Sequence, residues 1–206
     1  MAVYRFVQKK PCKMKKKAYI YPVTNRNSHG VLNPYIKNFA DSLSTHINFL
    51  NLYQPSDIGI LNIFKFLHKK LDYVFLNWIE DLADKKFGKI QVVVFIYIII
   101  PVCRLSGTKF IWVLHNKISH SKRNLKVKNW IAKKLAPKCN LILTHASDGI
   151  GFINELAGIG SHKAIFYHHP VDSLKLPAKR NEKKVDILIW GTILPYKGIL
   201  EFLYAV

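Results

Sequence analysis

Polar and aromatic side chains that can bind or exchange protons recur at one kind of position in this 206-residue sequence, directly after runs of apolar residues. In chain order they are Asn77, Trp78 and Glu80, then His115, Asn116 and His120, then His145 and Ser147, and finally His168 and His169. Any one of them alone is typical of an ordinary surface residue. Four successive apolar runs that end in the same way indicate a shared site.

The elements that must position these residues are predicted from apolar patterning. Strands are expected at 18–22, 47–53, 73–78, 109–116, 140–146 and 163–170. Helices are expected at 33–44, 57–71, 81–105, 121–136 and 147–157, the first of them capped by Asn33 with Pro34 in its first turn. Strands that alternate with helices predict an α/β fold, with a parallel sheet and helices on both faces. Ligands of such sheets bind at the carboxyl edge, where the polar residues would collect.

Composition and length favour a folded chain with anionic partners. Half of the residues are hydrophobic, and 32 Lys and Arg against 12 Asp and Glu give a net charge of +20. No Asp or Glu occurs between Lys85 and Ser147. Such a charge favours nucleic acid, phosphate-bearing substrates or an acidic membrane face, with a solvated lysine-rich surface as the alternative. Three cysteines without paired spacing indicate a reducing compartment and neither disulfides nor a zinc site.

The domain organisation changes at both ends of the chain. Residues 1–17 form a basic extension without periodicity, and 171–184 are polar and charged and are expected to be a linker. The run DILIW at 186–190 followed by GTILPYKG predicts a new strand, turn and helix within 185–206. The apolar run Val92–Cys103 is too short for a transmembrane helix of about 20 residues, so we expect a buried core element, with an interfacial membrane segment as the alternative.

Several functional motifs are missing from the sequence. There is no G-x-G-x-x-G after the first strand, no P-loop, no G-x-S-x-G and no H-E-x-x-H. Dinucleotide, P-loop and hydrolase interpretations therefore lose their main support, and no bound metal is expected. No nucleic-acid-binding module is recognisable, so the basic helix at 121–136 does not by itself predict a nucleic-acid partner.

Five segments together resemble the landmarks of GT-B glycosyltransferases, most closely the family-four type. They are FLNWIED, KFIWVLHNKISH, LILTHAS, IFYHHPV and ILIWGTILPYKGILEFL, in this order, and the resemblance covers residues 18–206. The strongest motifs are H-N-x-x-x-H, formed by His115, Asn116 and His120, and G-x-x-x-P-x-K-G, which contains Gly191 and Lys197.

The resemblance implies two Rossmann-like lobes that face each other across a cleft. The first, here 18–170, takes the acceptor, and the second binds a nucleotide-sugar donor through its diphosphate. Gly191, Thr192 and Lys197 would open the donor lobe, with Thr192 where the family often has a basic residue. The glutamate pair that holds the donor in many relatives would lie beyond residue 206, so we expect an acceptor lobe, a first βα unit and no transfer by these 206 residues alone.

The same resemblance assigns roles to the polar residues. His115 would hold a donor hydroxyl or act as a base, Glu80 and Asp81 are alternative bases, and Lys197 would stabilise the departing diphosphate without metal. The residues expected to line the acceptor side of the cleft are Asn77, Trp78, Asn116, His120, His145 and His169.

The expected function is transfer of a sugar from a nucleotide-sugar donor to a saccharide or lipid-linked acceptor. It requires no cofactor and would serve polysaccharide or glycolipid assembly in the cytoplasm, at the inner face of a membrane. The alternative is a non-catalytic basic α/β module that binds an anionic membrane or nucleic acid. The clustered strand ends favour the first function, and the charge alone favours the second.

Overall fold

The computed structural model describes residues 14–23, 33–54, 58–115, 123–158, 163–169, 187–189 and 198–205. The chain divides into two compact units, residues 1–172 and 173–206. Residues 1–13 of the predicted extension and the whole predicted linker 171–184 lie outside the described residues.

The first unit is built on a six-stranded sheet in which every neighbouring pair is parallel. Its strands are β1 (Lys16–Tyr21), β2 (Ile47–Phe49), β3 (Tyr73–Asn77), β4 (Lys109–Leu114), β5 (Leu141–Thr144) and β6 (Ala164–Phe166). The spatial order is β2-β1-β3-β4-β5-β6, so the chain changes direction across the sheet between β1 and β3. The predicted Rossmann-like parallel sheet is therefore confirmed.

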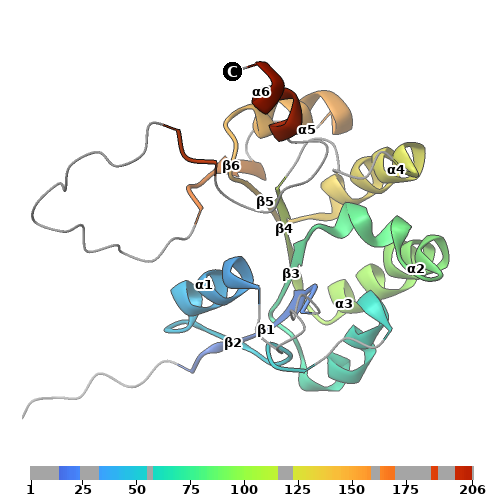
Figure 1. The fold of residues 1–206 in the computed structure, drawn as a ribbon. Helices are drawn as coiled ribbons and strands as arrows, with labels where there is room; N and C mark the ends of the chain where they lie inside the picture. The colour runs from blue at the N-terminus through green and yellow to red at the C-terminus, as the bar shows by residue number, and fades with distance from the viewer. Residues whose placement is uncertain are drawn as a thin grey trace, which may run out of the picture. The chain divides into compact units, whose positions relative to one another are not determined.

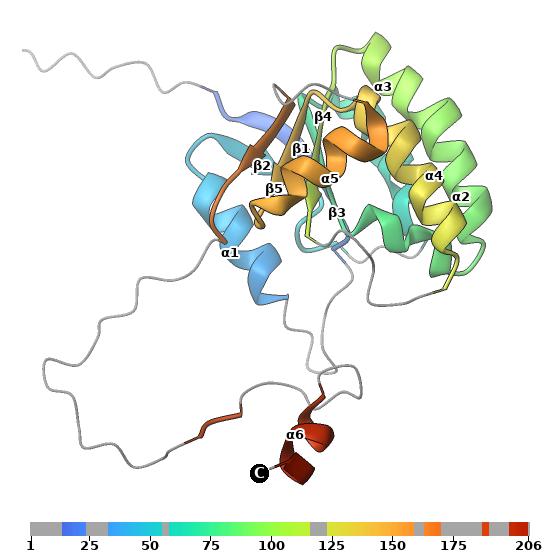
Figure 2. The ribbon, with the colours of Figure 1, turned by 90° about the horizontal axis from the view of Figure 1, so that it is seen from above.

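Helices cover both faces of this sheet, as predicted. Helix α1 (Pro34–Leu43) lies on one face (Figures 1 and 2). The other face carries η1 (Gly59–Lys69), η2 (Ile79–Asp84), α2 (Gly88–Val94), η3 (Phe95–Ile99), α3 (Ile100–Leu105), α4 (Leu125–Leu135), η4 (Ala136–Lys138) and α5 (Asp148–Ala157). We call these the α1 face and the helix-layer face.

Helix α1 begins where its sequence predicts. The Asn33 side chain accepts a hydrogen bond of 2.9 Å from the backbone N–H of Tyr35, and Pro34 occupies the first turn, where no N–H partner is needed. Ile36, Phe39 and Ala40 form the buried stripe of this helix. The cap fixes the first turn, and with it Tyr35, beyond the carboxyl ends of the strands.

The second strand is shorter than predicted because a side chain replaces its backbone. β2 ends at Phe49, and the carboxamide of Asn51 then accepts from the N–H of Ile20 at 3.0 Å and donates to the carbonyl of Ile20 at 2.8 Å. The buried Asn51 side chain therefore supplies the hydrogen bonds to the backbone of Ile20 in β1 that further residues of β2 would otherwise make.

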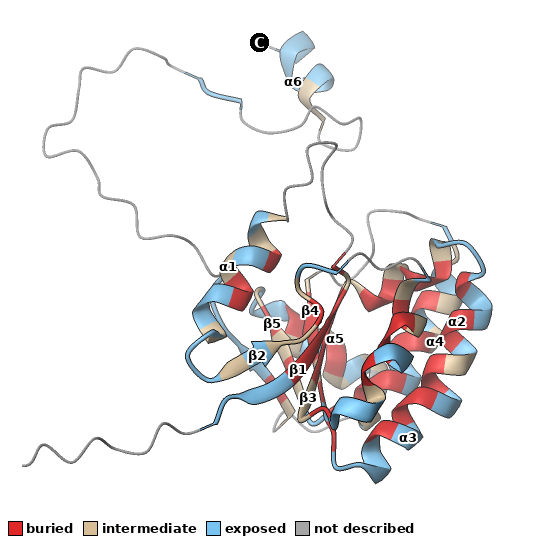
Figure 3. Cartoon of the chain, turned by 90° about the horizontal axis from the view of Figure 1, so that it is seen from below, coloured by how far each residue is buried: buried red, intermediate tan, exposed pale blue. Residues whose placement is uncertain are grey.

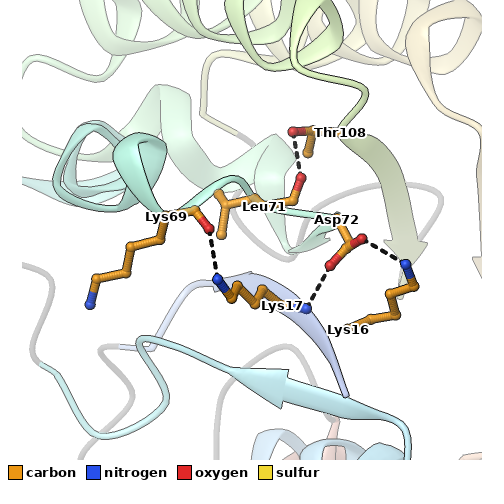
Figure 4. Close-up of polar contacts among 6 residues, drawn as sticks. All are labelled: Lys16, Lys17, Lys69, Leu71, Asp72 and Thr108. Atoms are coloured by element: carbon orange, nitrogen blue, oxygen red, sulfur yellow. Dashed lines mark hydrogen bonds and ion pairs between the residues drawn. The ribbon is translucent and has the colours of Figure 1, made fainter. Parts of the chain in front are cut away.

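The amino edge of the sheet extends β1 into the predicted basic extension. Lys16 and Lys17 belong to β1 because Asp72 holds both: its carboxylate accepts from the N–H of Lys17 at 2.8 Å and pairs with the Lys16 ammonium at 3.1 Å (Figure 4). In the same close-up the hydroxyl of Thr108 donates to the carbonyl of Leu71 at 2.8 Å and ties β4 to β3.

One continuous helix, Gly88–Leu105, contains α2, η3 and α3 and includes the apolar run Val92–Cys103. By length and composition it could cross a membrane, with a mean hydropathy of 1.8, but 44 % of it is buried inside the protein. The prediction of a core element is confirmed for one side of this helix, whose buried residues include Phe95, Ile99 and Cys103.

The second unit contains helix α6 (Ile199–Ala205). The strand predicted at 186–190 is wrong for residues 187–189, which have no regular secondary structure. Ile187 and Leu188 are mostly exposed, and among the described residues no strand pairs with them. A strand without a neighbour has no hydrogen-bond partners for its backbone and no packing partners for its apolar side chains. This accounts for the absence of the predicted strand at 187–189.

Candidate functional site

Four of the predicted site residues lie at the carboxyl ends of four adjacent strands and share one face of the sheet. Asn77 is the last residue of β3, and His115, His145 and His169 follow β4, β5 and β6. Side chains alternate between the two faces of a strand. Asn77, His115 and His145 stand two positions after Phe75, Val113 and Leu143, which pack on the α1 face. The parity of each strand therefore directs its last polar residue to the side that α1 covers.

Two aromatic residues complete this group. Tyr35 comes from the first turn of α1, and Trp78 directly follows Asn77. The indole of Trp78 stacks on the ring of His115 with centroids 4.1 Å apart, and the rings of His145 and His169 stack at the same distance. We call Tyr35, Asn77, Trp78, His115, His145 and His169 the histidine cluster.

The ring of Tyr35 holds the two stacks together. It meets the ring of His115 edge-on at 4.6 Å and lies edge-on to those of Trp78, His145 and His169 at 5.5 to 5.6 Å. Aromatic pairs prefer such perpendicular contacts because the ring edge is positive and the ring face is negative. The cluster is therefore a packed aromatic assembly at the edge of the sheet.

The hydrogen bonds of Asn77 determine the tautomer of His115. The Asn77 amide group donates to the carbonyl of Tyr21 at 3.3 Å, so its oxygen faces Nε2 of His115 at 3.2 Å. An amide oxygen can only accept, so Nε2 of His115 carries the proton. In the neutral ring Nδ1 then keeps its lone pair, and no described residue donates a hydrogen bond to it.

His145 has both ring nitrogens engaged. Its Nδ1 lies 2.7 Å from the carbonyl oxygen of Tyr167 and must donate, so its Nε2 accepts from the Tyr35 hydroxyl at 2.9 Å. Burial raises the pKa of Tyr35, so this phenol stays protonated and continues to donate. His145 therefore connects α1 to the segment after β6 and has a structural role in the cluster.

The cluster holds the rings of His115 and His169 in the neutral form. Burial, followed by the proximity of His145 and His169, lowers the pKa of His115 to about 3. Burial and the nearby His145 also lower the pKa of His169. At neutral pH the rings of His115 and His169 are therefore uncharged, in a chain whose net charge is +20.

Trp78 has a left-handed backbone, with φ of 45° and ψ of 35°. This conformation is unfavourable for a bulky side chain and typically costs about 1–3 kcal/mol. It turns the chain sharply after β3 and places the indole against His115. Strain of this kind, held in place by its surroundings, is common at functional sites.

Glu80 does not join the cluster. It lies one turn further along, in η2, and influences the pKa of Tyr21, which packs in the core of the helix-layer face. Burial raises the pKa of Glu80 to about 7, although the nearby indole N–H of Trp112 and the charge of Lys128 favour ionisation. Neither Oε2 of Glu80 nor Nε1 of Trp112 reaches full hydrogen-bond geometry with a described residue. Its role as a base stays a prediction.

The remaining predicted site residues, Asn116, His120, Gly191, Thr192 and Lys197, lie outside the described residues. Within the part of the chain that the structure describes, no group of three or more His, Cys, Asp or Glu residues is arranged to hold a metal ion.

Sequence reasoning missed Tyr35, the residue that contacts most of the cluster. The sequence does contain a signal for Tyr35. The Asn33–Pro34 cap starts α1, and because this helix follows β1 it must begin at the carboxyl edge of the sheet, which places Tyr35 there. The carbonyl of Tyr21 was also missed, since no side-chain pattern reveals a backbone acceptor.

The cluster lies beside the place where the strand order reverses. β1 and β3 are neighbours, β2 lies on one side of them and β4, β5 and β6 on the other. In open α/β sheets this reversal, at the carboxyl edge, is where ligands bind. Comparison of the chain with protein families, with curated proteins and with solved structures found no match.

Proposed function

We propose that the histidine cluster is the acceptor-side half of the active site of a GT-B glycosyltransferase. The observation that carries the proposal is His115, a neutral imidazole whose Nε2–H is held by Asn77 and whose Nδ1 lone pair no described residue occupies. Sugars present many hydroxyl groups, and a fixed neutral acceptor recognises a hydroxyl without attracting a competing anion.

The pKa of His115 distinguishes its two expected roles. A general base works best when its pKa lies near the operating pH. With a pKa of about 3, the His115 ring is a weak base but an effective hydrogen-bond acceptor. We therefore assign His115 to positioning a sugar hydroxyl rather than to removing its proton. Asn77 orients its ring, and Trp78 and Tyr35 prevent the ring from rotating.

In the proposed reaction the acceptor oxygen forms a bond to the anomeric carbon while the bond from that carbon to the diphosphate breaks. The acceptor proton passes to a base or to the departing phosphate. Negative charge grows on the diphosphate, and the resemblance implies that Lys197 would stabilise it together with Gly191 and Thr192. The acceptor is a saccharide or lipid-linked saccharide, and the site of action is the cytoplasmic face of a membrane.

A chimaera tests this function. Residues 1–184 are joined to the complete donor lobe of a family-four glycosyltransferase whose donor is known. Release of nucleoside diphosphate from that donor is measured in the absence of an acceptor, because transfer of the sugar to water can be followed without knowing the acceptor. We expect turnover that falls about 10²–10³-fold in His115→Ala, while binding of the nucleoside diphosphate to the donor lobe is unchanged.

Two results would count against the proposal. The first is a chimaera that binds the donor but turns over no faster than the donor lobe alone. The second is a His115→Ala form as active as its parent. Either result would favour the alternative, a basic module without catalytic activity.

A further inference from the structure

The helix Gly88–Leu105 has two apolar sides, and only one of them is used by the core. The buried side packs against the sheet through residues such as Phe95, Ile99 and Cys103. The opposite side carries a second set of apolar residues that are exposed: Phe87, Ile90, Val93, Tyr97, Ile98, Val102 and Leu105. Their exposed fractions run from 42 % for Val102 to 90 % for Leu105.

Apart from the adjacent pair Tyr97 and Ile98, these exposed residues recur every three or four positions, so they form one stripe along the outer side of the helix, beginning at its N-cap residue Phe87. Figure 3 shows the alternation, with buried positions of α2 and α3 toward the sheet and exposed positions away from it. We call Phe87, Ile90, Val93, Tyr97, Ile98, Val102 and Leu105 the outer stripe. Monomeric soluble proteins rarely expose a continuous apolar surface of this kind without a partner for it.

Basic residues surround the outer stripe. Lys85, Lys86 and Lys89 lie at its amino-terminal end and Arg104 near its carboxyl-terminal end, all of them exposed. Helix α4 lies beside it, joined by a contact of the Tyr97 and Trp130 rings at 6.3 Å. The exposed side of α4 adds Lys126, Lys133 and Lys134.

No acidic residue counters this charge from the helices that carry it. The chain has no Asp or Glu from Lys86 to Ala146. On η2, Asp81 and Asp84 are paired with the buried Lys128 of α4. The outer stripe is therefore an apolar strip with a positive border, set on a rigid helix.

We propose that this face of the first unit docks on an anionic lipid bilayer, with the outer stripe inserted among the acyl chains at headgroup depth and the lysines at the phosphates. An apolar helix side bordered by lysines, with aromatic residues near the water boundary, is the pattern of helices that lie in a membrane interface. The buried side of the same helix is part of the protein core, so the helix lies along the bilayer and does not cross it.

This docking sets the position of the histidine cluster. The outer stripe starts at Phe87, ten positions after Asn77, on the helix that returns from the carboxyl edge of the sheet. The carboxyl edge would therefore lie side-on to the headgroups rather than away from them. A lipid-linked saccharide could reach the cluster without leaving the bilayer. The docking itself does not depend on the proposed transferase activity.

Vesicle flotation with the full chain tests the proposal. The probes are vesicles of phosphatidylcholine alone and vesicles of phosphatidylcholine mixed with phosphatidylglycerol, at about 0.1 M salt, where charges are screened over about 10 Å. We expect the chain to float with the anionic vesicles only, and added salt to weaken the binding.

Two variants separate the apolar and the charged contributions. Ile90→Gln/Ile98→Gln should lower partitioning by at least about tenfold, because two aliphatic side chains no longer enter the bilayer. The matched control Ile165→Gln changes an aliphatic residue of similar exposure on β6 and should float like the wild type.

Lys126→Gln/Lys133→Gln/Lys134→Gln should lower partitioning by roughly 100-fold, since each lysine near an anionic surface contributes about fivefold. Its control, Lys15→Gln/Lys37→Gln/Lys109→Gln, removes the same number of charges from the amino edge of the sheet and from α1, on the opposite face. Equal circular dichroism melting curves show that each variant is folded.

Three results would overturn the proposal. The first is equal flotation with neutral and anionic vesicles. The second is equal loss of binding in the two lysine triples, which would show that net charge alone is responsible. The third is a wild-type dimer that ignores vesicles and becomes a monomer in Ile90→Gln/Ile98→Gln, which would assign the outer stripe to a second copy of the chain.

Discussion

The two faces of the sheet bury different chemistry. The helix-layer face has the larger core, formed by alternate residues of β1, β3, β4 and β5 packed against several helices. The α1 face has a smaller core, and beyond it, at the carboxyl edge, the histidine cluster. One face therefore supplies most of the packing, while the other leaves polar groups at the carboxyl edge of the sheet.

The faces also differ in the titratable group that each buries. Glu80 on the helix-layer side has its pKa raised to about 7, and His115 on the α1 side has its pKa lowered to about 3. The main cause is the same, because burial disfavours whichever form is charged. The Glu80 carboxyl is therefore a neutral acid below about pH 7, and the His115 ring is a neutral base above about pH 3, so their effects on stability have opposite pH dependence.

The largest expected effect comes from the core of the helix-layer face. Phe95→Ala removes a ring that is 1 % exposed and should lower the free energy of unfolding by about 3–5 kcal/mol. Ile98→Ala, three residues along the same helix but half exposed, should cost well under about 1 kcal/mol. Urea unfolding of both variants measures the difference, and equal losses would mean that the helix does not pack as described.

The next effect is the pH dependence of stability that Glu80 gives to the helix-layer face. The folded-state pKa of Glu80, about 7, lies above its ordinary value of 4.5, so its contribution to stability is present at low pH and is lost as pH rises through 7. Glu80→Gln has no such loss. Between about pH 5 and about pH 8, the free energy of unfolding of Glu80→Gln should therefore rise relative to that of the wild type by on the order of 2 kcal/mol.

Urea unfolding across this pH range checks the prediction for Glu80. If the stability curves of Glu80→Gln and the wild type run parallel from pH 5 to pH 8, the carboxyl is ionised in the folded protein and the burial argument is wrong.

A smaller effect is expected at the centre of the histidine cluster. Tyr35→Phe keeps the ring contacts but removes the hydroxyl that donates to Nε2 of His145. The loss should be about 1 kcal/mol, as for one partly buried hydrogen bond. The melting temperature of Tyr35→Phe measures this, with Tyr204→Phe on the exposed side of α6 as the unaffected control. Equal melting temperatures for Tyr35→Phe and Tyr204→Phe would show that the Tyr35 hydroxyl does not form the hydrogen bond to His145.

The sequence predicts the sheet well because each strand carries its own signal. Apolar runs, the Asn33–Pro34 cap and the alternation of strands with helices locate every strand of the first unit. The end of β2 could not be predicted, because it depends on a carboxamide that completes the edge of a strand distant in sequence. The strand predicted at 186–190 is wrong over 187–189 for the opposite reason, since an apolar run forms a strand only beside a partner.

The histidine cluster was partly predictable. Asn77, His115, His145 and His169 could be chosen because all four follow apolar runs. The face on which each lies follows from strand parity, which the position of Glu80 also illustrates: after the left-handed turn at Trp78 the chain enters η2, and its residues no longer follow the alternation of β3. The tautomer of His115 depends on an amide and a backbone carbonyl, so no sequence pattern contains it.

The proposed role of the histidine cluster depends most directly on the protonation state of the His115 ring. Long-range ¹H–¹⁵N spectra of the histidine side chains, recorded from about pH 8 down to about pH 4, report which nitrogen carries a proton, and His115→Gln assigns the signal. We expect a protonated Nε2 and an unprotonated Nδ1 that persist well below pH 6.5, the ordinary imidazole pKa. An imidazolium at His115 by about pH 6, or a proton on Nδ1 in the neutral ring, would contradict it.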